Sequence, residues 1–162
     1  MNNHPLRNFV SLLFFYSSFA LSGQSLKEEK MQQLGFMVGD WIGTSVSFEE
    51  GKIVSEIPAY EKISYDLDQH ILVVQLHSAS LQLHTIIYFD EEDNTYYYYP
   101  FSKRGVRRLP ASFEDGKLIV RSGPDTRYIF HSPEERTFQE YGEKLVGGEW
   151  VKYFEDTFLN TE

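Results

Sequence analysis

Residues 70–90 read HILVVQLHSASLQLHTIIYFD, two runs of alternating polarity on either side of a Ser-Ala-Ser segment. Alternation with a period of two is typical of a β-strand with one buried and one exposed face. If residues 79–80 form a two-residue turn, the two runs pair as a hairpin in which His77 lies opposite Gln82. One face of this hairpin is then polar. The other face carries Leu72, Val74, Leu76, Leu83, Thr85 and Ile87.

The same pattern continues on both sides of this hairpin. Turn-forming pairs such as Glu50-Gly51, Asp115-Gly116 and Gly147-Gly148 separate short runs rich in β-branched and aromatic residues. These sequential strands, without a second helix, predict an all-β fold, an antiparallel up-and-down barrel of about ten strands, because closure removes the exposed edges of a sheet. The predicted strands are residues 41–48, 57–66, 70–77, 82–89, 95–101, 105–113, 117–122, 126–131, 137–143 and 149–158.

One helix is predicted ahead of the strands. Between Leu26 and Met37, apolar residues recur at a spacing that places Met31 and Leu34 on the same helical face. The segment is short and charged on its other face, which is typical of a helix that lies across a barrel end.

Residues 1–23 have the parts of a secretory signal peptide. Arg7 precedes an apolar run at residues 9–21, and small residues follow at Ala20 and Ser22. The run is shorter than the roughly 20 apolar residues that a membrane span needs. An uncleaved anchor and a buried helix are the alternatives. The favoured division is a signal peptide at 1–23 and a barrel domain at 24–162, with a periplasmic or secreted location.

Composition excludes several classes of function. The formal net charge of −9 argues against nucleic acid and anionic membrane surfaces as partners. The chain contains no cysteine, which excludes disulfides, thiol catalysis and zinc-thiolate sites. The sequence also lacks a G-x-S-x-G elbow and a glycine-rich phosphate loop, so that no catalytic residue is predicted.

Several short segments carry a family resemblance. Leu34–Gly43 (LGFMVGDWIG) combines the end of a short helix with a G-x-W sequence at the first strand. This arrangement resembles the calycin superfamily of lipocalin-like proteins. More closely, the chain resembles an uncharacterised bacterial family of lipocalin-like β-barrels, distantly akin to nitrobindin-type heme-binding barrels. The other matching segments are YDLD (65–68) with ILVV (71–74), IYFD (87–90) with YYYY (96–99), and EYGE (140–143) with WVKYFE (150–155).

The resemblance implies an internal cavity and a helix that closes one barrel end. It implies that Trp41, between Gly39 and Gly43, packs at the closed end, so these three residues are predicted to be structural. In the heme-binding relatives, a histidine on the final strands ligates the iron. Here the last histidine is His131, and none lies within 132–162. Heme is therefore not favoured, and no cofactor is predicted.

His77 and His84 belong to the polar face of the first predicted hairpin, where Gln75 opposes His84. Three interpretations are open for this face: a surface exposed to solvent, a polar patch in the lumen, or a metal site, since imidazole is a common metal ligand. Two histidines without a nearby carboxylate make a poor metal site, and no metal ion is predicted.

Arg107 continues the apolar face of a second predicted hairpin, which turns at Asp115-Gly116. It lies either at the barrel mouth or inside, where it would bind an acidic ligand or pair with Glu140 or Glu155. The apolar face that it extends consists of Leu109, Ala111, Phe113, Leu118 and Val120.

Three functions follow from these observations. The favoured one is a binding protein that holds a small, largely hydrophobic molecule in its lumen, because small barrels often enclose one ligand. The alternatives are an envelope interaction or structural protein with a filled barrel, and a cavity enzyme such as an isomerase or hydrolase. The candidate ligand-binding residues are His77, His84, Arg107 and Glu140.

Overall fold

The computed structural model describes residues 25–161. The predicted signal peptide at 1–23 lies outside the described residues. Within the described part, no helix is long and apolar enough to cross a membrane.

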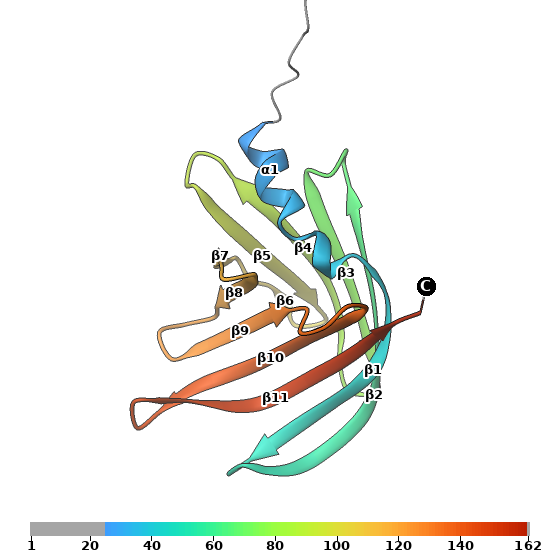
Figure 1. Cartoon of the computed structure of the whole chain (residues 1–162). Helices are drawn as coiled ribbons and strands as arrows, with labels where there is room; N and C mark the ends of the chain where they lie inside the picture. Colours follow the sequence, from blue (N-terminus) through green and yellow to red (C-terminus); the bar gives the residue numbers. More distant parts are fainter. Residues whose placement is uncertain (1–24, 162) are drawn as a thin grey trace, which may run out of the picture.

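In residues 25–161, ten strands form a closed antiparallel β-barrel with a short helix at one end (Figure 1), and an eleventh strand of two residues lies at the rim. Successive strands pair as hairpins, and the ring closes where the first strand pairs with the last. This confirms the predicted fold class. The strands are β1 (Gly39–Glu49), β2 (Lys52–Asp66), β3 (Ile71–Ser78), β4 (Gln82–Asp90), β5 (Thr95–Ser102), β6 (Gly105–Val106), β7 (Leu109–Glu114), β8 (Lys117–Arg121), β9 (Thr126–His131), β10 (Thr137–Val146) and β11 (Glu149–Asn160).

The pairing of both predicted hairpins is confirmed. His77 lies opposite Gln82 across β3 and β4, and Ala111 lies opposite Val120 across β7 and β8. Because side chains alternate along a strand, these registers also fix which residues share a face of the sheet.

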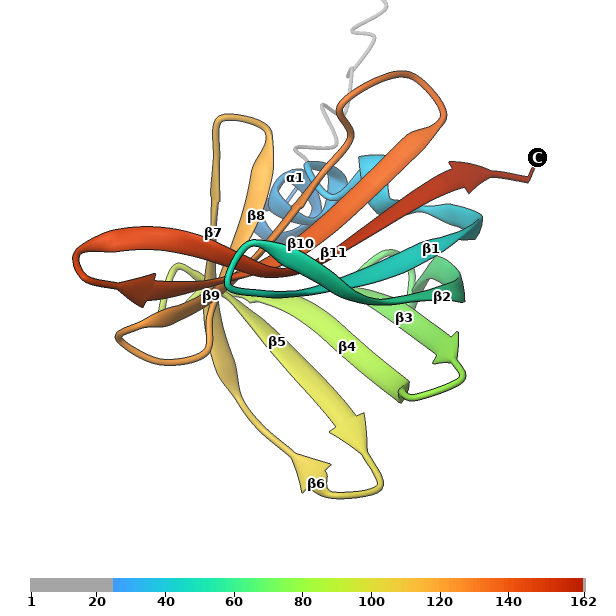
Figure 2. The ribbon, with the colours of Figure 1, turned by 90° about the horizontal axis from the view of Figure 1, so that it is seen from below.

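Two predicted strands differ most from the structure, and the others differ by a few residues at their ends. Residues 105–113 form two strands, because Arg107 and Arg108 leave the ladder between β6 and β7. β6 is a two-residue strand that pairs with β5 at the rim. β2 begins at Lys52, since it pairs with β1 along a long hairpin with a register shift at Ser47. Seen from the side opposite to the helix, the β5–β6 and β10–β11 hairpins extend outward (Figure 2).

The predicted helix is divided into α1 (Leu26–Gln32) and the 3₁₀ turn η1 (Gly35–Met37). α1 begins with a capping box, in which Ser25 and Glu28 exchange side chain–backbone hydrogen bonds. Met31, Leu34 and Met37 are fully buried, as the apolar face predicted, whereas Leu26 is exposed.

Three barrel side chains hold the helix in place. The Tyr65 hydroxyl donates to the Met31 carbonyl at 2.7 Å, and the Tyr96 hydroxyl donates to the Lys30 carbonyl at 2.7 Å. Trp41 Nε1 donates to the Met37 carbonyl at 2.8 Å. The Lys30 and Met31 carbonyls also accept from the backbone amides of Gln33 and Leu34, so the tyrosine hydroxyls are second donors to them.

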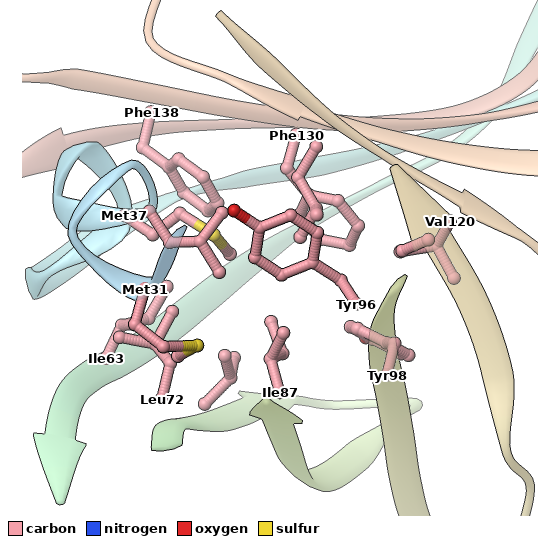
Figure 3. Packing of buried hydrophobic residues seen from close by; sticks show 14 of the residues in the cluster. Met31, Met37, Ile63, Leu72, Ile87, Tyr96, Tyr98, Val120, Phe130 and Phe138 are labelled. Atoms are coloured by element: carbon pink, nitrogen blue, oxygen red, sulfur yellow. The ribbon is translucent and has the colours of Figure 1, made fainter. Parts of the chain in front are cut away.

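The barrel end beneath the helix is filled by large apolar side chains. Figure 3 shows Met31 and Met37 from the helical segment among side chains of the barrel wall. Phe138 is fully buried, and its ring packs against Trp41, with centroids 5.4 Å apart, and against Phe158, at 5.9 Å. This end of the barrel is therefore a solid core.

The glycines beside Trp41 allow close approach of β1 and β11. A Cβ added to Gly43 would collide with the Thr157 carbonyl, and one added to Gly39 would lie 2.6 Å from Asn160 Nδ2. Trp41 itself is buried at the closed end, where the resemblance placed it.

Candidate ligand-binding site

A cavity of about 470 Å³ opens at the barrel end opposite to α1. Arg104 and Val106, from the β5–β6 hairpin, lie at its mouth. The wall is mainly apolar and aromatic and includes Leu76, Leu83, Tyr98, Leu109, Tyr128 and Phe154.

Small inward-facing residues explain why this end is hollow. β1 contributes Ser45 and Ser47 to a second hollow of about 240 Å³, which shares Leu76 and Phe154 with the larger cavity. On β10, Gly142 leaves room for Phe154, whose ring atoms would collide with an added Cβ. β1 carries Trp41 at the closed end and serine here, and β10 carries Phe138 at the closed end and glycine here.

Three carboxyl groups point into the barrel near these hollows. They are Glu61 on β2, Glu140 on β10 and Asp156 on β11, with side chains 1%, 7% and 4% exposed. Glu140 lines the larger cavity, and Asp156 lines the smaller one. Glu140 and Asp156 are directly opposite each other in the β10–β11 ladder.

Burial changes the protonation of this carboxyl cluster (Glu61, Glu140 and Asp156). Burial, followed by the charge of Asp156, raises the pKa of Glu61 to about 8. Burial and the neighbouring Glu61 and Asp156 raise the pKa of Glu140 well above its ordinary value. Burial also raises the pKa of Asp156, against the opposing effect of hydrogen bonds with Ser45 and Glu140. With a pKa of about 8, the Glu61 carboxyl is mainly protonated at pH 7.

The cluster lacks cationic partners within the protein. Among residues 25–161, no Lys, Arg or His forms an ion pair with Glu61, Glu140 or Asp156. Glu61 Oε2 and Asp156 Oδ1 are buried without any hydrogen-bond partner, and so is the neighbouring Thr85 Oγ1. Buried polar atoms without partners are rare in proteins, because each loses its bonds to water.

The prediction that His77 and His84 are lumen residues is wrong. Both are exposed on the outer face of the barrel, where they alternate with the inward-facing Leu76 and Thr85. The pairing was predicted correctly, but pairing does not reveal which face is inside. The interpretation as a solvent-facing polar surface is the correct one.

Arg107 lies at the mouth of the cavity. Its Nη1 donates to Ser122 Oγ at 3.0 Å, and its Nη2 donates to the Ser122 carbonyl at 2.7 Å. The alternative in which Arg107 forms an internal ion pair with Glu140 or Glu155 is therefore wrong. Glu155 forms an ion pair with Lys152 instead. Of the four predicted ligand-binding residues, Glu140 and Arg107 line the cavity.

His131 does not fit the heme-ligating role seen in the resembled barrels. Its Nε2 is 2.8 Å from Gln139 Oε1, and its ring lies edge-on to Tyr141, 5.8 Å between centroids. These contacts are on the outer face, where His131 and Gln139 are paired in the β9–β10 ladder. In the described part of the chain, no group of three or more His, Cys, Asp or Glu side chains is arranged to hold a metal ion.

Sequence reasoning missed Glu61 and Asp156, although the alternation contained a signal for both. Glu61 stands between Ala59 and Ile63 on the buried face of β2, and Asp156 stands two residues before the buried Phe158 on β11. An acidic residue in phase with buried apolar residues is the pattern that identifies them.

Comparison with known proteins gives no assignment: no family model and no curated protein matches this chain.

Proposed function

We propose that this protein is an exported binding protein that holds a small, largely hydrophobic molecule in the open half of its barrel. The observation that carries the proposal is the cavity of about 470 Å³ with mainly apolar and aromatic walls. Its volume lies within the roughly 300–1,000 Å³ typical of small-molecule sites.

The proposed location rests on the sequence of residues 1–23, which has the parts of a signal peptide. The proposed kinship with lipocalin-like barrels agrees with the fold and with the helix that closes one end.

The outer surface offers less support for an interaction protein. Its most aromatic part consists of Tyr88, Tyr97 and Tyr99 on β4 and β5, where the guanidinium of Arg108 stacks 3.7 Å from the Tyr97 ring centre. The Tyr97 hydroxyl donates to Asp93 at 2.6 Å. These side chains bind one another and brace the β4–β5 turn, so a partner is not needed to explain them.

The proposal is tested with N-phenyl-1-naphthylamine, an apolar dye that is uncharged at neutral pH and fluoresces in apolar surroundings. We expect saturable binding with a dissociation constant on the order of micromolar. Leu83→Trp places a bulkier side chain in the cavity wall and reduces the space for the dye. It should weaken dye binding by about tenfold or more, equivalent to ~1.4 kcal/mol.

The matched control is Ile86→Trp, on the outward face of the same strand, which should leave the affinity unchanged. Absence of saturable binding, or equal loss in both variants, would contradict a ligand site in the lumen.

A further inference from the structure

We propose that the ligand of this cavity carries a protonated amine, and that its ammonium group binds between Glu140 and Asp156 at the inner end of the cavity. The inference rests on the proposed function, since it assumes that the cavity holds a ligand. It adds the chemical class of that ligand: an apolar body with one basic nitrogen.

The placement of the carboxyl groups supports an occupant from the cavity side. Glu140 and Asp156 are opposite each other on adjacent strands. Glu140 lines the larger cavity and Asp156 lines the smaller hollow, and the two hollows share Leu76 and Phe154 in their walls. Glu61 lies behind them, fully buried, and interacts electrostatically with both. An ammonium group at this point would lie between the Glu140 and Asp156 carboxyls, with Glu61 as an electrostatic neighbour of both.

The unsatisfied atoms define what that group must supply. Asp156 Oδ1, Glu61 Oε2 and Thr85 Oγ1 have no partner. A bound cation favours the ionised form of these carboxyls, and ionised carboxylates only accept hydrogen bonds, so a cationic occupant must donate them. An ammonium group offers three donors and one positive charge, which is what a cluster of buried acids without a cation lacks.

Other ligand classes fit this cluster less well. A carboxylate or phosphate would bring further negative charge into an acidic lumen. A neutral alcohol would supply one donor and no charge. Arg104 and Arg107 at the mouth are cationic, but the chain as a whole carries a formal net charge of −9, which favours the approach of a cation.

The experiment compares three probes with the same chain and different head groups: octylamine, 1-octanol and octanoic acid. Affinity is measured at pH 7 by displacement of N-phenyl-1-naphthylamine and by calorimetry. We expect octylamine to bind about tenfold tighter than 1-octanol or better, and octanoic acid to bind weakest.

Isosteric variants identify the groups responsible. Asp156→Asn and Glu140→Gln should each weaken octylamine binding by about tenfold while leaving 1-octanol binding within about twofold. Glu56→Gln removes one negative charge from the exposed face of β2 and serves as the control, with no expected change for either probe.

Proton release gives a second readout that a purely structural role of the acids would not produce. An ammonium group stabilises ionised carboxylates, so its binding expels protons that the free cluster holds. Calorimetry in two buffers of different ionisation enthalpy should show proton release with octylamine and none with 1-octanol. The titratable groups facing this site are the three carboxyls and the phenols of Tyr98, Tyr128 and Tyr153.

The outcomes separate the two proposals. If 1-octanol binds as tightly as octylamine and no proton is released, the amine inference is overturned while the apolar binding function stands. If octanoic acid binds tightest, the inference is likewise overturned, and Arg107 at the mouth becomes the anchor to test. If none of the three probes displaces the dye, and the dye itself does not bind, both proposals are overturned.

Discussion

The two ends of this barrel are built from the same strands, but the lumen is filled at one end and hollow at the other. At the end closed by α1, Phe138, Phe158 and Trp41 fill the lumen, and the carbonyls of the helical segment accept bonds from barrel side chains. At the open end the lumen is hollow, and carboxyl oxygens are buried without partners. The closed end supplies stability, which allows the open end to retain unsatisfied polar groups.

The largest expected effect is on the filled end. Phe138→Ala removes a fully buried ring from the centre of the aromatic core and should lower the free energy of unfolding by about 3–5 kcal/mol. The change is measured by urea denaturation of the ligand-free protein.

Phe154→Ala is the matched change at the open end, where the side chain borders a cavity. It should cost about 1–2 kcal/mol, because the ring already lacks close neighbours on one side. Equal losses in the two variants would contradict the distinction between a solid and a hollow end.

The second effect concerns pH and the carboxyl cluster. Glu61 has its pKa raised from 4.5 to about 8 in the folded protein. Between these values the folded state binds more protons than the unfolded state, so the contribution of Glu61 to stability is complete below about pH 4.5 and is lost as pH rises through 8. Relative to the wild type, Glu61→Gln should gain roughly 2–4 kcal/mol between pH 5 and pH 9.

Denaturation at a series of pH values measures this gain, with Glu56→Gln on the outer face of the same strand as the control. A difference between Glu61→Gln and wild type that stays constant with pH would show that Glu61 is ionised in both states.

A third effect tests the tight contact of β1 with β11. Gly43→Ala would drive a methyl group into the Thr157 carbonyl and should cost about 1–3 kcal/mol through displacement of the strands. Gly123→Ala, in the β8–β9 loop, meets its nearest neighbour at 3.6 Å and should change stability by less than about 0.5 kcal/mol. Similar thermal unfolding of the two variants would contradict the close approach.

The smallest effect concerns the attachment of the helix. Tyr65→Phe removes the hydrogen bond to the Met31 carbonyl and should lower stability by about 1 kcal/mol. Hydrogen exchange of the α1 amides should become faster, while affinity for N-phenyl-1-naphthylamine should not change, since α1 lies at the other end of the barrel. A loss of dye affinity in this variant would show that the two ends are coupled.

The sequence was sufficient to predict the strands, their order and the register of the two hairpins, because alternation and turn chemistry are local properties. It did not reveal which face was inside, and this is why His77 and His84 were assigned to the lumen. The carboxyl cluster was missed for a related reason. Glu140 and Asp156 meet across the β10–β11 hairpin, but Glu61 joins them only when β1 pairs with both β2 and β11.

The most direct test of the account is a methyl NMR titration that observes both ends at once. Leucine methyl groups are assigned, and N-phenyl-1-naphthylamine is added, since its aromatic rings shift the resonances of nearby methyls. The account predicts large shifts for Leu76, Leu83 and Leu109 at the open end, and little change for Leu34, Leu72 and Leu118 at the closed end. Equal shifts at both ends, or shifts confined to the outer surface, would contradict the assignment of the open half of the barrel as the binding site.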